Sequence, residues 1–215
     1  MRLGTGVIGG RAAHVVFTAN ANTSSNGTNR NFTVNFGDEA PGRKIIFAVI
    51  SYSGLGTTPS SVAIAGQSPT LVAQSTNRLR LYIADVPTGA SGNINVQYGT
   101  TSSGTSVMVW AAYGLKNATA YDTRTATMAI GVASADLSIN TRSGGIVLAA
   151  TEDGANGTST TWSGVVMDFQ NTSTINNWVR SGASANVKNG ESPRAITVAS
   201  SNTSSTRNAL AASFR

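Results

Sequence analysis

At 215 residues and 22.0 kDa the chain is long enough to bury a sizeable core unaided, and its lack of cysteine excludes thiolate metal sites, disulfides and thiol nucleophiles. Charged residues make up only 11%, against roughly 25% in an ordinary soluble domain. The net charge of +6 is dispersed along the chain rather than gathered into a face or tail, so we expect no nucleic-acid partner.

Residues 1–30 are expected to form an extended, flexible N-terminal arm. Glycines crowd residues 4–10, a short strand fits 14–18, and 20–29 is almost entirely Asn, Ser, Thr and Gly. Such a stretch buries too little apolar surface to offset the entropy of ordering it, so it should be mobile unless a neighbouring subunit holds it. Arginine suits protein interfaces because its planar guanidinium group reaches carboxylates and stacks on aromatic rings. The candidate partner contacts in the arm are Arg2, Arg11 and Arg30.

Residues 31–215 are expected to form the β domain. Apolar and polar residues alternate over 31–36, as on a half-buried strand, whereas 43–52 is apolar on both faces and is typical of a central strand. Ser, Thr, Asn and Gly elsewhere favour strand surfaces and turns over helix interiors. Further strands are expected at 60–65, 69–74, 78–84, 93–98, 105–115, 125–131, 135–139, 144–151, 161–169, 193–199 and 207–214.

The pattern predicts an all-β fold, a single antiparallel β-sandwich of jelly-roll-like type that carries the N-terminal arm. No stretch of a dozen residues shows the 3.6-residue apolar period of a capped helix. The two halves share a weak similarity, namely a two-faced apolar strand, a polar Gly/Thr loop and a strand with a tryptophan. We do not interpret this similarity as a repeat.

Residues capable of catalysis are sparse. Glycines 4, 6 and 9 match a dinucleotide fingerprint, but only three residues precede them and no helix pattern follows. His14 is the only histidine and is interpreted as an ordinary strand residue, and the nine acids form no pair aimed into one cleft. We therefore expect no catalytic residue, no cofactor and no metal, with a calcium-binding loop at 153–157 as a weaker alternative.

The tryptophans offer the other candidate contacts. Trp110 lies in a segment that is apolar on both sides, so it is expected in the core, as is Trp162. Trp178 is flanked by polar residues and is expected to be exposed. With its neighbour Arg180, it is a candidate partner contact and the best candidate for a glycan-binding side chain.

Residues 43–215 carry a resemblance in the order of their strands and turns. The segments that carry it are 51–54, 61–66, 70–72, 81–89, 107–113, 144–149 and 161–164. This succession resembles a group of tailed-phage virion structural proteins, of decoration or minor head or tail type, from phages and prophages of alphaproteobacteria. The resemblance implies a virion component, assembled in the host cytoplasm, and it transfers no functional residue.

The expected function is therefore contact rather than chemistry. The leading hypothesis is a capsid decoration protein that binds the major capsid protein or other virion proteins and forms a homo-oligomer, with a trimer expected around a local symmetry axis. The alternative is a tail-associated or fibre protein whose sandwich binds a host glycan. No membrane partner is expected, because the longest apolar run, 45–50, is too short to cross a bilayer and no signal peptide is recognisable.

Overall fold

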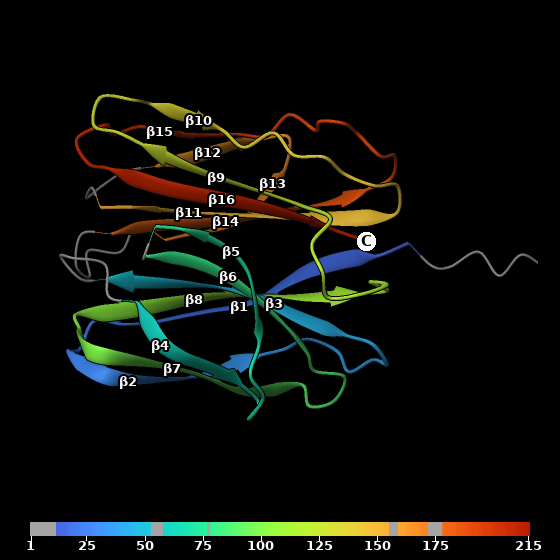
Figure 1. The fold of residues 1–215 in the computed structure, drawn as a ribbon, viewed down its shortest axis with the longest axis horizontal. Coiled ribbons are helices and arrows are strands. Elements are labelled where there is room, and N and C mark those ends of the chain that lie inside the picture. The colour runs from blue at the N-terminus through green and yellow to red at the C-terminus, as the bar shows by residue number, and fades with distance from the viewer. Residues whose placement is uncertain (1–11, 53–57, 77, 155–158, 172–177) are drawn as a thin grey trace, which may run out of the picture.

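The fold was analysed in a computed structural model, which describes residues 12–52, 58–76, 78–154, 159–171 and 178–215 (Figure 1). These residues form sixteen strands, all paired antiparallel, and no helix, so the all-β prediction is confirmed. In the first half the strands are β1 (His14–Thr23), β2 (Gly27–Asn35), β3 (Lys44–Tyr52), β4 (Pro59–Ile64), β5 (Thr70–Ser75), β6 (Leu79–Asp85), β7 (Ser91–Ser102) and β8 (Gly104–Tyr113). In the second half they are β9 (Asp122–Met128), β10 (Ser134–Asp136), β11 (Gly145–Asp153), β12 (Thr160–Ser163), β13 (Val166–Asn171), β14 (Val179–Val187), β15 (Thr197–Ser200) and β16 (Arg207–Phe214).

The strands make four stacked sheets, so the expectation of a single sandwich was wrong. The N-terminal outer sheet has the order β2-β7-β4 and the N-terminal inner sheet β1-β8-β3-β6-β5. The C-terminal inner sheet has the order β13-β14-β11-β16-β9 and the C-terminal outer sheet β10-β15-β12. Figure 1 shows the layers in the sequence outer, inner, inner, outer. In a stack of four layers, each inner sheet is covered by another sheet on both of its faces. This explains why β3, β8, β11 and β16 are buried on both sides.

The second half repeats the strand order of the first. Adding eight to each strand number converts β1-β8-β3-β6-β5 into β9-β16-β11-β14-β13, and β2-β7-β4 into β10-β15-β12. The two halves thus share one strand order, although the tryptophans of the weak sequence similarity lie on strands that do not correspond, Trp110 on β8 and Trp162 on β12. The two inner sheets stack in opposite senses, since β1 lies against β11 and β14 while β5 lies against β9 and β16. The halves thus meet in an approximately two-fold manner.

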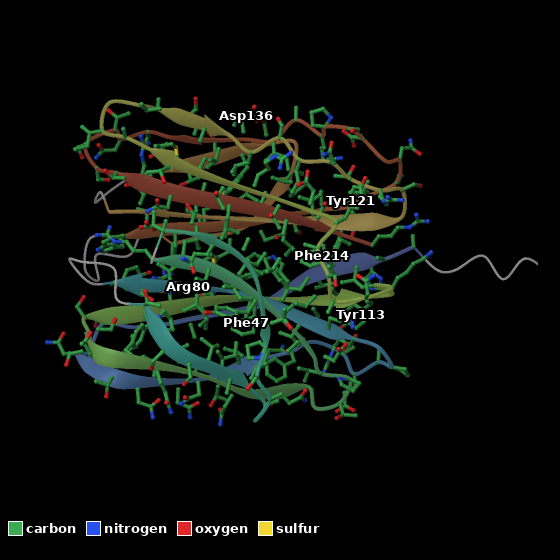
Figure 2. All side chains as sticks on the ribbon, viewed as in Figure 1. Phe47, Arg80, Tyr113, Tyr121, Asp136 and Phe214 are labelled. Carbon is green, nitrogen blue, oxygen red and sulfur yellow. The ribbon has the colours of Figure 1, made fainter. Side chains whose placement is uncertain are left out.

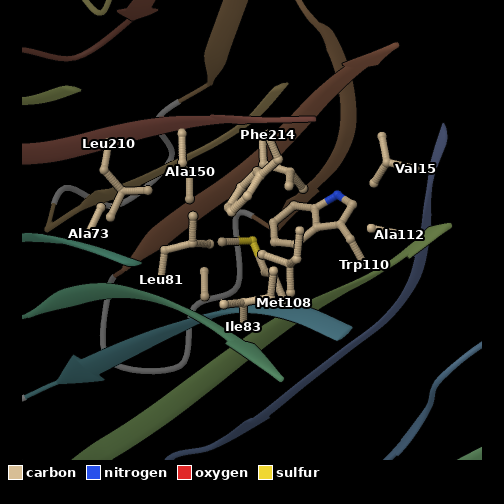
Figure 3. Packing of buried hydrophobic residues seen from close by; sticks show 14 of the residues in the cluster. Val15, Ala73, Leu81, Ile83, Met108, Trp110, Ala112, Ala150, Leu210 and Phe214 are labelled. Carbon is tan, nitrogen blue, oxygen red and sulfur yellow. The ribbon is translucent and has the colours of Figure 1, made fainter. Parts of the chain in front are cut away.

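Each interface between layers has its own hydrophobic core. The two sandwiches bury separate clusters centred on Phe47 and Val147, and the central cluster joins the two inner sheets. Figure 3 shows Met108 and Trp110 of the N-terminal inner sheet reaching toward Phe214 of the C-terminal one. Trp110 is fully buried, as expected, and its indole Nε1 donates a hydrogen bond to Asp168 Oδ2 at 2.8 Å. The central core makes the two halves one folded unit.

Most of the described part of the expected arm, residues 12–30, belongs to the sheets. The segment 14–23 is β1, which pairs with β8 along its length, and the predicted boundary at residue 30 falls inside β2. Polar composition was misleading because most side chains of β1 are half-buried and its backbone pairs with β8, which lies far along the chain. Residues 1–11 of the expected arm lie outside the described residues.

Candidate functional site

The expected contact residue Arg30 is a buried structural residue. Its Nη2 donates a 2.7 Å hydrogen bond to the carbonyl oxygen of Ser102 and a second to that of Ser25, while Nη1 contacts Ser25 Oγ at 3.3 Å. The guanidinium group therefore ties the turn between β1 and β2 to the end of β7. This corrects the expectation of a surface contact, and the other two candidates in the arm, Arg2 and Arg11, lie outside the described residues.

Trp178 and Arg180 lie at the interface between the two inner sheets. The Trp178 ring is half-buried, with the Tyr52 ring centroid 5.3 Å away and the Arg78 guanidinium carbon 4.7 Å from its centroid. Arg180 is only 1% exposed and donates from Nη1 to Tyr52 Oη at 2.7 Å. Arg180 is thus buried where the two halves meet, which corrects its assignment as a partner contact. Trp178 is only half-buried, so its role as a partner contact stays a prediction. Of the polar neighbours that suggested exposure, Arg180 is itself buried, and residues 172–177 lie outside the described residues.

A buried polar cluster surrounds Arg180. Glu152 on β11 lies directly opposite Arg180 on β14 and Asn208 on β16, so the three side chains share the face that meets the N-terminal inner sheet. Tyr52 Oη also contacts Ser106 Oγ at 2.7 Å. We call these five residues the central polar cluster.

Protonation of the central polar cluster is governed by burial. Burial raises the pKa of Glu152 to about 7, although the hydrogen bond from Asn208 Nδ2 and the positive charge of Arg78 both lower it. Burial also raises the pKa of Tyr52, so its phenol stays neutral. Within the described part of the chain, Glu152 Oε2 and both Nε and Nη2 of Arg180 have no hydrogen-bond partner. The cluster is therefore a structural feature with a titratable group at its centre.

The opposite face of β11 carries a second buried pair. Asp153 Oδ2 lies 4.0 Å from Arg207 Nε, and the carboxylate accepts hydrogen bonds from Ser200 Oγ (2.9 Å) and Ser205 Oγ (2.6 Å). These contacts join the C-terminal inner sheet to the segment after β15. Asp153 is the first residue of the expected calcium loop and is buried, whereas residues 155–158 lie outside the described residues.

A cavity lies at the other end of the seam between the halves and is lined in part by Arg215. Figure 1 marks the C-terminal end of the chain. The volume of the cavity is about 990 Å³, and both halves contribute to its wall. We call it the junction cavity, and its lining includes His14, Leu115, Lys116, Val187, Lys188 and Arg215. An adjoining hollow of about 340 Å³ shares Lys116 and Arg215 and adds Arg142.

Backbone hydrogen bonds fix the walls of the junction cavity. Ala13 N donates to Gly144 O at 2.9 Å, which links the first half to the second, and Lys116 N donates to Arg215 O at 2.9 Å. His14 begins β1, as its interpretation as a strand residue requires, and its ring stacks on Tyr113 with centroids 4.8 Å apart. Figure 2 shows Tyr113 and Tyr121 at this end of the molecule and Arg80 toward the other. The cavity is thus preformed.

Sequence reasoning missed the junction cavity. Its lining residues come from positions as far apart as 12 and 215, and neither motif nor spacing connects them.

Among the residues that the structure describes, no three His, Cys, Asp or Glu side chains gather as a metal site would require. The same residues include no helix that is long and apolar enough to span a bilayer. In comparisons with known proteins, no family model matches the chain and no curated protein matches it.

Proposed function

We propose that the chain is a non-enzymatic structural protein of a tailed-phage virion, acting as a capsid decoration protein that binds the capsid lattice and self-associates. The observation that carries the proposal is the exposed apolar pair at the edge of the C-terminal inner sheet. Val166 and Met167 on β13 are 71% and 46% exposed. Apolar side chains on an unpaired edge strand are a liability that favours coverage by another chain.

The geometry of β13 indicates what kind of contact it makes. Its pairing with β14 is interrupted by a bulge between Met167 and Phe169. Bulges bend an edge strand and discourage continuous strand-to-strand addition. Val166 and Met167, which project to opposite faces of the strand, are therefore suited to side-chain packing against a partner that covers this sheet edge rather than to strand-to-strand addition.

The strand order supports the same proposal at the level of fold. We infer that each half is a jelly roll, because eight strands divide into one sheet with the order 1-8-3-6 and a second with 2-7-4, strand 5 extending the first. Jelly rolls occur in viral capsid and lectin domains, so the fold is compatible with both the decoration hypothesis and its alternative. We propose the first on the resemblance to phage structural proteins that was inferred from the sequence of residues 43–215.

One observation favours the alternative, a tail-associated or fibre protein that binds a host glycan. The exposed face of the N-terminal outer sheet carries uncharged polar side chains that bond across strands. Thr33 Oγ1 donates to Asn93 Oδ1 at 2.8 Å, and Asn95 Nδ2 donates to Asn29 Oδ1 at 2.7 Å. Amide and hydroxyl groups can both donate to and accept from sugar hydroxyls. Binding to a neutral glycan on an array, weakened by Asn93→Ala, would favour this role.

Capsid binding is the decisive test. Purified protein is mixed with phage capsids that lack it, and bound protein is measured by sedimentation and located by electron microscopy. We expect saturable binding that V166E/M167E abolishes, because two carboxylates cannot be buried in an apolar contact. The matched control T161E/S163E places the same charges on the edge strand β12 and should bind normally. Failure of the unmodified protein to bind would overturn the decoration proposal, and normal binding by V166E/M167E would overturn the role of β13.

A further inference from the structure

The charged side chains that line the junction cavity are all positive. Its lining includes Lys116, Lys188 and Arg215, and the adjoining hollow adds Arg142. Among the residues that the structure describes, no Asp or Glu lines either hollow. Like charges gathered in a concave site of low-dielectric walls concentrate the field and attract anions. An anionic ligand therefore matches the cavity better than a neutral or cationic one.

The floor of the junction cavity is apolar. Leu115 and Val187, both buried, lie among the lining residues, together with Ala13 and Pro41. Apolar surface with a few polar groups at its rim is the usual composition of a ligand site, and a volume of about 990 Å³ is at the upper end of such sites. A ligand that fills it needs apolar groups as well as negative charge.

The aromatic rings near the cavity are already engaged. His14 is stacked on Tyr113, with an interplanar angle of 15°. The Arg142 guanidinium carbon lies 4.3 Å from the centroid of the Tyr121 ring and covers one of its faces. Single-stranded nucleic acids are held by bases stacked on free aromatic faces along a basic groove. The cavity lacks such a platform in its described lining, so a protein segment fits it better than a nucleic acid.

We propose that the junction cavity binds a short acidic and apolar segment of a partner protein. Carboxylates of the segment contact Lys116, Lys188 and Arg215 at the rim, and its apolar side chains pack on Leu115 and Val187. The hydrogen bonds that link the two halves hold these walls in place before binding, which lowers the cost of association. This inference rests on the cavity alone and holds for any partner, whether or not the protein belongs to a virion.

The test uses a fluorescently labelled short peptide of alternating Glu and Leu and the full-length protein. His14 is the only histidine, so labelling histidine gives one ring signal that reports directly on the cavity in NMR spectra. We expect a saturable shift of this signal and a matching rise in fluorescence anisotropy. Added salt should weaken binding because the rim cations are exposed and therefore screened.

Charge-reversed variants locate the binding site. K116E/K188E should lower the affinity for the peptide by at least about tenfold, because two attractions between rim cations and peptide carboxylates become repulsions. The control R124E/R194E changes the net charge equally, but Arg124 and Arg194 line neither hollow and are paired with Asp122 and Glu191. Its affinity should stay close to that of the unmodified protein. Each of three results would overturn the proposal: no peptide binding, equal loss in both variants, or tighter binding of a short oligothymidylate that shifts the His14 signal.

Discussion

The indole ring of Trp110 occupies the space that a side chain at Gly182 would need. A Cβ atom placed on Gly182 would lie 2.6 Å from Trp110 Cζ2 and 3.2 Å from Met108 Sδ. Gly182 belongs to β14 of the C-terminal inner sheet, whereas Trp110 and Met108 belong to β8 of the N-terminal one. The glycine is therefore required by the packing of the two halves against each other rather than by its own backbone.

Gly182→Ala should destabilise the protein by about 1–3 kcal/mol, the usual cost of forcing an extra methyl group into a packed core. Chemical denaturation followed by tryptophan fluorescence measures the change. Gly99→Ala is the matched control, since Gly99 also lies in a strand and a Cβ atom there would meet nothing within 4 Å. Equal stability of the two variants would show that the halves do not pack as described.

Tyr52→Phe should cost about 2 kcal/mol, because it removes the one described hydrogen-bond acceptor of the buried Arg180 guanidinium. Tyr98→Phe is a graded comparison: the Tyr98 hydroxyl is also buried, and its described hydrogen-bond partners are the neutral hydroxyls of Ser51 and Thr105, at 2.9 and 2.7 Å. It should cost about 1 kcal/mol. Urea denaturation of both variants measures the difference, and a smaller loss for Tyr52→Phe would contradict a charge-assisted bond at Arg180.

Glu152 should make the protein less stable as the pH rises. Its folded pKa of about 7 exceeds the ordinary value of 4.5, so folding favours the neutral carboxyl. Below 4.5 the group is protonated in both states. Between 4.5 and about 7 only the unfolded carboxyl ionises, and stability falls by a total of about 3 kcal/mol before levelling off.

Glu152→Gln tests this dependence, because the amide keeps the shape of the acid and cannot ionise. Denaturation midpoints are compared from about pH 4 to about pH 8, with the variant expected to match the parent at the acidic end and to exceed its stability at the basic end. Some slope should remain from Asp168, whose pKa is also raised by burial. A variant that is less stable at every pH would show that Glu152 is ionised and held by Arg78.

Local patterns predicted many individual strands but missed β14 (Val179–Val187), which lies inside the C-terminal inner sheet. The apolar segment 43–52 became β3, and the alternation over 31–36 became the buried and exposed positions of β2. The presence of two sandwiches instead of one was not predicted, because the two halves share their strand order but not their side chains. The contacts that define it, such as Trp110 with Gly182, join residues whose partnership no local period reveals.

The sites were predicted less well, for the same reason. Polar side chains near Trp178 suggested exposure, but the N-terminal half packs against this part of the C-terminal half, where Arg180 is buried. The cations of the junction cavity become neighbours only through the four-layer arrangement. Their charge can be read from the residue types, whereas their proximity comes from the fold.

A truncation that removes residues 1–30 distinguishes an arm from an integral strand. It deletes all of β1, with its nine registered pairs to β8, and the first part of β2. Val15 and Phe17 would be lost from the central core, and β8 would become an exposed apolar edge. We expect aggregated protein without a cooperative unfolding transition by circular dichroism, whereas a truncation that removes only 1–11 keeps every described pair of β1 and should unfold cooperatively. If the protein that lacks residues 1–30 unfolds cooperatively at the same midpoint as the full chain, β1 is dispensable and the interpretation of residues 1–30 as an arm is correct.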